Sequence, residues 1–277
     1  MDNKPIFHVD KNKCCGDGLC VNICPMNLLK LKEGESYPSI LEDKEKNCIK
    51  CAHCLCVCPH FAISIDGINP ENCLKIKSTN YVDFDKVEQL LRGRRSIRQY
   101  KDQPVEQEKI TKLLNLASTA PTAGNSQQVG WMVINSKKDM QQLSAMTIDM
   151  FRNMVVKKHP LSQTYSLEGI INIFDNGYDV VLREAPVLII AHAPKNYSIG
   201  IVDCSIAVTY LDLAAPSLGL GTCWAGFLMM ACPNWEPIQK YLNLPEGNIC
   251  CGAMMLGYPK YKYQRMPARN KAKIIWK

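Results

Sequence analysis

Hydrophobic residues in the first 78 positions occur as short runs separated by long polar loops. Runs of three or four strand-forming residues predict short β-strands rather than helices. A domain with so few apolar positions buries little surface, so part of its folding energy must come from another source, such as metal ligation. The strands expected on this basis are 6–9, 28–31, 39–41 and 62–65.

Beyond residue 85 the apolar pattern lengthens. Apolar residues at helical spacing predict helices over 85–92, capped by Asp85, and over 107–120, ending before Pro121. Residues 205–218 are almost wholly apolar, which predicts a helix buried in a core or at a subunit interface. Short apolar runs predict buried strands at 131–134, 187–191 and 250–256.

This change in pattern divides the chain into two domains. A polar stretch over 75–85 joins a small domain, 1–78, to a larger one, 85–277. Helical and strand patterns alternate in the larger domain, which predicts layers of helix and sheet and places the chain in the α+β class.

The cysteine spacing identifies the chemistry of the small domain. A complete C-x2-C-x2-C-x3-C-P run is formed by Cys48, Cys51, Cys54 and Cys58-Pro59. This run is a bacterial iron–sulfur signature, whose fourth cysteine ligates the cluster of the other half. The same spacing occurs thirty-four residues earlier, with an aspartate replacing the second cysteine, in Cys14, Asp17, Cys20 and Cys24-Pro25.

The repeat therefore predicts two cubane (4Fe-4S) clusters with crossed ligation. One set of ligands is Cys48, Cys51, Cys54 and Cys24. The other set is Cys14, Asp17, Cys20 and Cys58. Clusters of this kind carry electrons, so the small domain is expected to be an electron-transfer unit.

Asp17 leaves three interpretations of the first site open. It ligates iron through oxygen, a harder donor than thiolate, which would leave one iron labile and allow a 3Fe-4S form. Alternatively, Cys15 moves in as the fourth ligand, helped by the flexible backbone of Gly16 and Gly18. The third interpretation is an empty site. The matching spacing favours Asp17.

Structural zinc is the other metal that such C-x2-C pairs hold. The proline after the last cysteine of each copy favours iron. No histidine shows metal-ligand spacing, but His53 and His60 lie in or beside the second ligand loop, where hydrogen bonding would tune a cluster. The other cysteines lie outside the spacing (Cys15 and Cys56) or in settings typical of small core residues (Cys73, Cys204, Cys223, Cys232, Cys250 and Cys251).

Composition and charge exclude several other classes of protein. The polar N-terminus lacks the apolar core of a signal peptide, and no run reaches the roughly 18 apolar residues of a membrane span. Fifteen cysteines in such a chain indicate metal binding in a reducing cytoplasm, and oxygen-sensitive clusters suit an anaerobe. The net charge of +7 favours anionic partners, but without a long Lys/Arg run no nucleic-acid partner is expected.

Four motifs follow one another in the larger domain. They are Arg94-Arg95-Ser96-Ile97-Arg98, residues 120–127, residues 219–226 and Gly257-Tyr258-Pro259, with Arg265 and Arg269 beyond. In this order they resemble the FMN-dependent nitroreductase family, and the whole chain resembles ferredoxin–nitroreductase fusion proteins. The resemblance implies a bacterial-ferredoxin-like domain followed by nitroreductase-like α/β/α layers. It also implies a flavin site formed between two subunits, and therefore a homodimer.

The first motif suits the FMN phosphate. Arg94 and Arg98 are planar forks that can make charge-assisted contacts with a dianion, and Ser96 adds a hydroxyl donor between them. A solvated basic turn is the alternative for this segment. Arg95 matches a position that touches the cofactor in the family.

The resemblance assigns three further segments to FMN. The loop with Pro121, Thr122, Asn125 and Gln127 would reach the flavin from the partner subunit. The backbone at Ala225-Gly226 would lie near flavin N5, where an N–H stabilises negative charge. Arg265 and Arg269 are equal candidates for completing the phosphate site. The chain departs from the family at Gln128, where proline is usual, and at Ala225, where glutamate is common.

Clusters carry single electrons, whereas FMN also delivers a hydride equivalent. We therefore expect the clusters to feed FMN, and FMN to reduce a small electron-poor substrate, a nitroaromatic by resemblance, without a catalytic side chain. No G-x-G-x-x-G fingerprint is present, so the electron donor is expected to be an external ferredoxin or NAD(P)H. The alternatives are a quinone, enone or halogenated substrate, or an electron-transfer protein with a non-catalytic flavin site.

Overall fold

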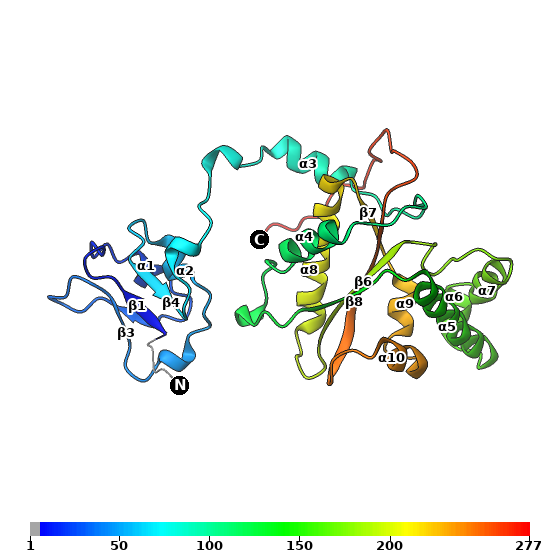
Figure 1. The fold of residues 1–277 in the computed structure, drawn as a ribbon, viewed down its shortest axis with the longest axis horizontal. Coiled ribbons are helices and arrows are strands. Elements are labelled where there is room, and N and C mark those ends of the chain that lie inside the picture. Colours follow the sequence, from blue (N-terminus) through cyan, green and yellow to red (C-terminus); the bar gives the residue numbers. More distant parts are fainter. Residues whose placement is uncertain (1–5) are drawn as a thin grey trace. The chain divides into compact units, whose positions relative to one another are not determined.

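The computed structural model describes residues 6–277, and the chain forms two compact units (Figure 1). The first unit comprises Met1–Tyr81 together with the short segment Ala123–Ser126. The second comprises Val82–Thr122 and Gln127–Lys277. The boundary falls within the polar stretch that the sequence marks, but Ala123–Ser126 was not expected to belong with the first unit.

The first unit consists of two antiparallel ribbons and two short helices. Strand β1 (Phe7–Val9) pairs with β4 (Ile63–Ile65), and β2 (Leu29–Lys30) pairs with β3 (Ser39–Ile40). All four strands lie where the sequence predicts them and are one or two residues shorter. Among the described residues, four 3₁₀ turns complete the unit: Glu45–Asn47, Pro70–Asn72, Ser78–Asn80 and Ala123–Asn125.

Helices α1 (Leu19–Ile23) and α2 (His53–Val57) begin in the same way. Each follows a residue in the left-handed conformation, Gly18 with φ 71° and Ala52 with φ 59°. These are equivalent positions of the repeat, so the two copies share backbone geometry even where a side chain strains it. Their buried cysteines, Cys20 and Cys54, belong to the small core of this unit.

The second unit is built on a four-stranded antiparallel sheet with the order β5-β6-β8-β7. The long central pair, β6 (Val187–Pro194) and β8 (Asn248–Gly257), runs from Val187 opposite Leu256 to Pro194 opposite Asn248, with a bulge at Ala191/His192. The edges are β5 (Gly130–Ile134) and β7 (Gly221–Trp224).

Helices cover both faces of this sheet (Figure 1). On one face Val187 and Ile189 pack against α4 (Gln107–Ala117) and α8 (Gly200–Ala214). On the other, Leu188 and Ile190 pack against a layer that includes α5 (Lys137–Val156) and α9 (Gly226–Ala231). This alternation of buried side chains makes a three-layer α/β/α domain and confirms the predicted fold class. The other helices of this unit are α3 (Phe84–Gly93), α6 (Pro160–Thr164), α7 (Leu167–Asp175) and α10 (Glu236–Leu242), with a 3₁₀ turn at Ala215–Leu218.

Several boundaries differ from the sequence-based prediction. Asp83, not Asp85, is the cap residue of α3, and α4 ends at Ala117, where the chain turns through Ser118 to Ala120. The apolar helix predicted over 205–218 starts at Gly200 and closes as the 3₁₀ turn Ala215–Leu218. Cys73 and Cys250 are only partly buried.

The segment Gly200–Leu218 is long and apolar enough to cross a membrane by length and composition. It nevertheless carries two buried carboxylates, Asp203 and Asp212. Its apolar face packs against α4, β6 and β8 in the core. These contacts are those of a core helix in a layered domain.

Candidate functional site

The first unit contains two cavities lined by cysteines. One cavity, called the first cavity because most of its ligand positions belong to the first copy of the repeat, is bordered by Cys14, Asp17, Cys20 and Cys58. The other, the second cavity, is bordered by apolar side chains and by Cys24, Cys48, Cys51 and Cys54. Each cavity thus combines three ligand positions of one copy with the last cysteine of the other, the grouping that crossed ligation requires. The thiol and carboxylate donors at these positions are suited to iron–sulfur clusters.

The fourth cysteine of each copy is held in the same way. The N–H of Leu28 donates to Sγ of Cys24, and the N–H of Ala62 donates to Sγ of Cys58, each at 3.4 Å. Hydrogen bonds to cluster sulfurs are among the factors that set reduction potentials. The repeat therefore supplies one such contact to each cavity.

Burial affects the thiols of the two central cysteines. It raises the pKa of Cys54 to about 12, with further contributions from the nearby Cys48 and Cys51. Burial also raises the pKa of Cys20. Without metal these thiols are therefore protonated at neutral pH, and metal binding must release their protons.

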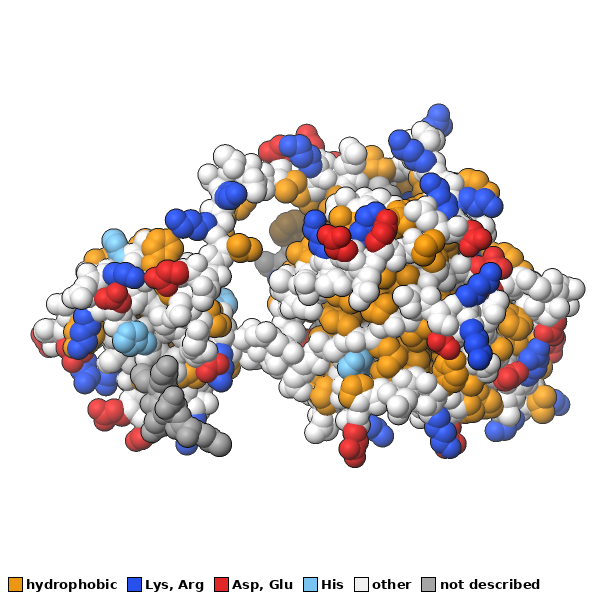
Figure 2. All heavy atoms as spheres, viewed as in Figure 1, with side chains coloured by type: hydrophobic (Ala, Val, Ile, Leu, Met, Phe, Trp, Pro, Cys, Tyr) orange, Lys and Arg blue, Asp and Glu red, His pale blue; other side chains and the backbone are white. Residues whose placement is uncertain are grey.

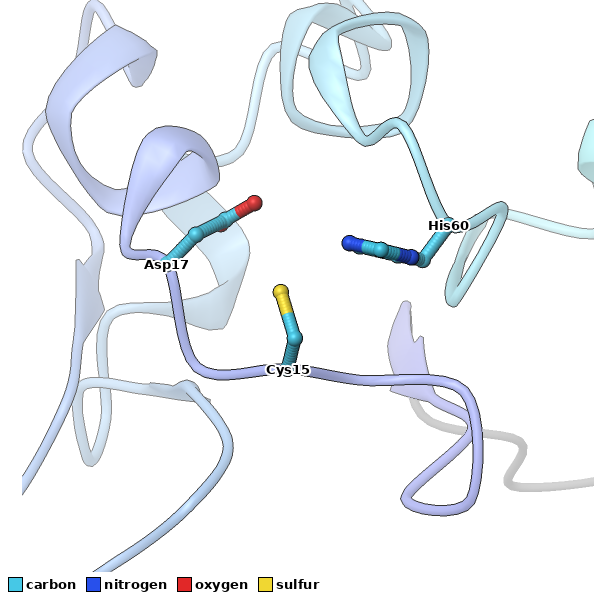
Figure 3. Close-up of side chains that lie close together, drawn as sticks. All are labelled: Cys15, Asp17 and His60. Carbon is cyan, nitrogen blue, oxygen red and sulfur yellow. The ribbon is translucent and has the colours of Figure 1, made fainter.

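Asp17 lies at the first cavity, as its spacing predicts. Its Oδ1 accepts a hydrogen bond from the N–H of Leu19 at 3.1 Å, which orients the carboxylate at the start of α1. Cys15 and His60 line the same cavity. Their side chains point toward the Asp17 carboxylate (Figure 3). The geometry brings both Asp17 and Cys15 to the first cavity. It also places His60 there, which spacing alone did not identify as a metal ligand.

In the second unit, the segment after α3 is fixed against β7. The N–H of Ile97 donates to the carbonyl of Thr222 at 2.8 Å. The side chain of Ile97 covers Gly221, where an added Cβ would lie 2.4 Å from Ile97 Cγ1. Glycine is therefore needed at position 221 so that the basic segment, residues 94–98, can lie this close to the sheet.

Arg94 is anchored by a residue that sequence reasoning missed. Its Nε lies 3.4 Å from Oδ2 of Asp212, a buried carboxylate on α8. The hydroxyl of Thr222 donates to Oδ1 of the same carboxylate. The available signal was an acidic residue inside an otherwise apolar helix, because a buried charge normally requires a partner.

The basic segment does not present all its polar side chains to one side. Arg94 and Arg95 line an open hollow, and Arg95 lies over the Tyr263 ring with 5.9 Å from Cζ to the ring centre. The hydroxyl of Ser96 instead hydrogen-bonds the thiol of Cys223, and Arg98 lies close enough to oppose the rise in the pKa of that buried thiol. The other cationic residues that line the hollow are Lys86, Lys101, Lys260 and Lys262.

The loop after Pro121 is closed by a hydrogen bond from the N–H of Gln127 to Oγ1 of Thr122 at 3.0 Å. Gly124, Asn125 and Gln127 all have positive φ, between 50° and 59°. Asn125, which belongs to the first unit, donates its amide to the carbonyls of Ile49 and Lys50 there, each at 3.1 Å. This conformation is unstrained at Gly124 and is uncommon for a residue such as Gln127.

Ala225 and Gly226 differ in what their backbone can offer. The N–H of Ala225 already donates to the carbonyl of Ala253 at 2.9 Å. Gly226 begins α9, where N–H groups lack partners within the helix, and no atom lies within 4 Å of a Cβ built on it. Of the two, Gly226 is therefore the position open to a ligand.

Arg265 and Arg269 lie in an exposed C-terminal segment without helix or strand. The hollow that contains Arg94 is lined by residues up to Tyr263. Neither arginine lines this hollow.

A protein-family comparison accounts for both units. Residues 91–258 match the nitroreductase family, a span that includes the basic segment, β7 and the start of α9. The chain belongs to the nitroreductase family. Residues 7–30 match a 4Fe-4S binding domain, so a ferredoxin-like unit precedes the nitroreductase domain.

Known proteins resemble different portions of this chain. A candidate NADH dehydrogenase/NAD(P)H nitroreductase of Methanothermobacter thermautotrophicus is 29% identical over 192 residues, covering 66% of this chain and 85% of that protein. Ferredoxin-1 of Nitratidesulfovibrio vulgaris is 47% identical over 30 residues, 11% of this chain and 48% of the ferredoxin.

Solved structures show the fold of the second unit. A nitroreductase with bound FMN from Bacteroides fragilis superposes with a TM-score of 0.57 at 19% identity, covering 69% of this chain and 99% of the other. A nitroreductase with bound FMN from Desulfitobacterium hafniense gives 0.55 at 22% identity, covering 70% and 100%. The predicted fold and family are therefore confirmed.

Proposed function

We propose that the protein is an FMN-dependent oxidoreductase in which two iron–sulfur clusters pass electrons to FMN for the reduction of an electron-poor substrate such as a nitroaromatic. The observation that carries the proposal is one chain with two cysteine-lined cavities and a nitroreductase domain. Carriers of single electrons and a flavin in one chain suit a conversion of single-electron input into two-electron output.

The residues of the second unit suit FMN. The hollow is lined by six cationic residues, which favour a phosphate dianion, and Asp212 holds Arg94 in place. Gly226 leaves open space above its backbone, where a planar ring can approach closely. When bound, FMN supplies the electron and hydride chemistry, and the protein supplies binding and orientation.

Crossed cluster ligation is the corresponding proposal for the first unit. Cys24, Cys48, Cys51 and Cys54 hold one cluster in the second cavity. Cys14, Cys20 and Cys58 hold the other in the first cavity, where Asp17 is the favoured fourth ligand. The grouping of these side chains around separate cavities supports both sets.

We further propose that the flavin site is completed in a homodimer. Ile201, Val202 and Tyr210 of α8 are exposed although the helix is largely apolar. Figure 2 shows hydrophobic side chains gathered over much of the face of the second unit that it presents. Exposed apolar area of this kind marks an interaction surface. A dimer would also give Arg265 and Arg269 a partner subunit on which to act.

The experiment that tests the function is anaerobic purification followed by iron, sulfide and flavin analysis. Protein reduced with dithionite is then mixed in turn with a nitroaromatic, a quinone, an enone and a halogenated compound, and reoxidation is followed by absorption. We expect iron, sulfide and FMN together, with fastest reoxidation by the nitroaromatic. Iron and sulfide without flavin absorption would instead indicate an electron carrier. A fully flavin-loaded monomer in light scattering would contradict the dimer.

A further inference from the structure

Three side chains at the first cavity have metal-binding atoms directed at one another. The Sγ of Cys15, a carboxylate oxygen of Asp17 and a ring nitrogen of His60 all lie within 4.8 Å of one another (Figure 3). All three residues are exposed, and all three border the first cavity. We call them the metal trio. They come from two different copies of the repeat, so their convergence depends on the fold.

The other half of the repeat provides an internal comparison. At the positions equivalent to the metal trio stand Ile49, Cys51 and Met26, and these three border the second cavity. Cys51 is a thiol at a standard cluster position, isoleucine has no donor atom, and the methionine thioether is only a weak acceptor. At the second cavity, one cysteine therefore supplies the only strong donor of these three positions. At the first cavity, all three equivalent positions carry strong donors.

We propose that the metal trio holds one divalent first-row metal ion, of the Fe²⁺, Co²⁺ and Zn²⁺ group, at the non-cysteine corner of the first cluster. This inference rests on the proposed function, because it requires an iron–sulfur core on Cys14, Cys20 and Cys58. Thiolate, imidazole and carboxylate together suit borderline ions of this group better than Mg²⁺ or Ca²⁺, which prefer oxygen ligands.

The surroundings of the metal trio are compatible with ligation. The Leu19 N–H contacts only Oδ1 of Asp17, and a carboxylate retains further lone pairs on both oxygens. Binding would displace the proton of the Cys15 thiol and use the neutral imidazole of His60, so no other reactant is needed. Two of these three donors are nitrogen and oxygen, which are harder than thiolate, so the site suits borderline metal ions as well as iron.

The test uses the full-length protein, purified anaerobically and treated with EDTA to remove weakly held ions. It is then titrated with Co²⁺, and bound cobalt, iron and sulfide are measured in the same samples. The comparison variant, Cys15→Ile/Asp17→Cys/His60→Met, copies the second half of the repeat. We expect wild-type protein to bind one more Co²⁺ per chain than this variant.

Single variants assign the donors. His60→Met and Cys15→Ile should each weaken Co²⁺ binding at least tenfold, about 1.4 kcal/mol. The nitrogen coupling in the pulsed electron paramagnetic resonance spectrum of bound Co²⁺ should disappear in His60→Met. Cys56→Ser, which removes an exposed thiol outside both cavities, should bind Co²⁺ like wild type. Should the triple variant lose its iron, these single variants provide the comparison.

Each outcome has a distinct meaning. Equal Co²⁺ uptake by iron-loaded wild type and iron-loaded triple variant overturns the inference and leaves the proposed function intact. Loss of uptake in Asp17→Asn, with no effect of His60→Met or Cys15→Ile, assigns the corner to Asp17 alone and also overturns it. Wild-type protein without iron and sulfide overturns both proposals.

Discussion

The guanidinium of Arg94 is paired with the carboxylate of Asp212, which is buried on α8 and also accepts the hydroxyl of Thr222. This pair connects the basic segment after α3 to the core helix of the second unit. It keeps the Arg94 fork in one position at the edge of the hollow, where its remaining N–H groups are available to a phosphate.

We expect Asp212→Asn to weaken FMN binding about tenfold, or about 1.4 kcal/mol, because the arginine loses the charge that orients it. The equilibrium constant can be measured by fluorescence titration of deflavinated protein with FMN. Asp149→Asn is the matched control, since Asp149 forms an exposed surface pair with Arg152, a type of pair that contributes little to stability. Unchanged FMN affinity in Asp212→Asn would mean that this anchor does not serve the cofactor.

Gly221→Ala should destabilise the second unit by about 1–3 kcal/mol, because the new Cβ would meet Ile97 at 2.4 Å and Pro259 at 2.8 Å. All four tryptophans of the chain lie in the second unit, so urea unfolding followed by tryptophan fluorescence reports on this unit.

Gly169→Ala is the matched control for Gly221→Ala. Gly169 lies inside α7 with no atom within 4 Å of an added Cβ, so the substitution should stabilise the unit by up to about 1 kcal/mol. Equal effects of the two substitutions would contradict the packing argument.

The sequence predicted the parts of this protein that depend on local spacing. The cysteine repeat predicted which side chains share a cavity, because this spacing is typical of two-cluster domains in which the last cysteine of each copy serves the other half. Two of the apolar runs predicted buried strands, which the structure has as β6 and β8 at the centre of the sheet, although both strands are longer than the runs.

The parts that escaped prediction depend on contacts between distant segments. The partnership of Asp212 with Arg94 joins residues more than a hundred positions apart, and no local pattern encodes it. The convergence of His60 with Cys15 likewise arises only when the two copies pack together. Helices α5, α6, α7, α9 and α10 were not predicted. In the longest, α5, polar and apolar residues are less clearly separated onto two faces than in α3 and α4, which explains its omission.

Crossed ligation predicts which cysteine substitutions share a phenotype. Cys24→Ser should diminish the same cluster signal as Cys48→Ser, although Cys24 belongs to the other copy, because both thiols border the second cavity. Cys58→Ser should resemble Cys14→Ser. Electron paramagnetic resonance of the dithionite-reduced protein, with iron analysis, distinguishes the two signals. If Cys24→Ser resembled Cys14→Ser instead, each copy would hold its own cluster.

His192 gives the second unit a predictable response to acid. Burial lowers the pKa of its imidazole below the usual 6.5, and Asn248 contacts Nδ1 at 2.8 Å. Because an amide nitrogen can only donate, Nδ1 must accept, which requires the neutral ring. In the unfolded chain the imidazole binds a proton more readily than in the folded protein. Its contribution to stability is therefore fully present above pH 6.5 and is lost as the pH falls toward the lowered folded-state value.

We expect the free energy of unfolding of the second unit to decrease as the pH is lowered from 7 to 5, and His192→Gln to make this dependence shallower. The expected reason is that glutamine keeps a polar group in the site but has no proton to gain. Urea unfolding at several pH values, followed by tryptophan fluorescence, measures both slopes. Parallel pH profiles for wild type and His192→Gln would show that the acid sensitivity arises from other groups.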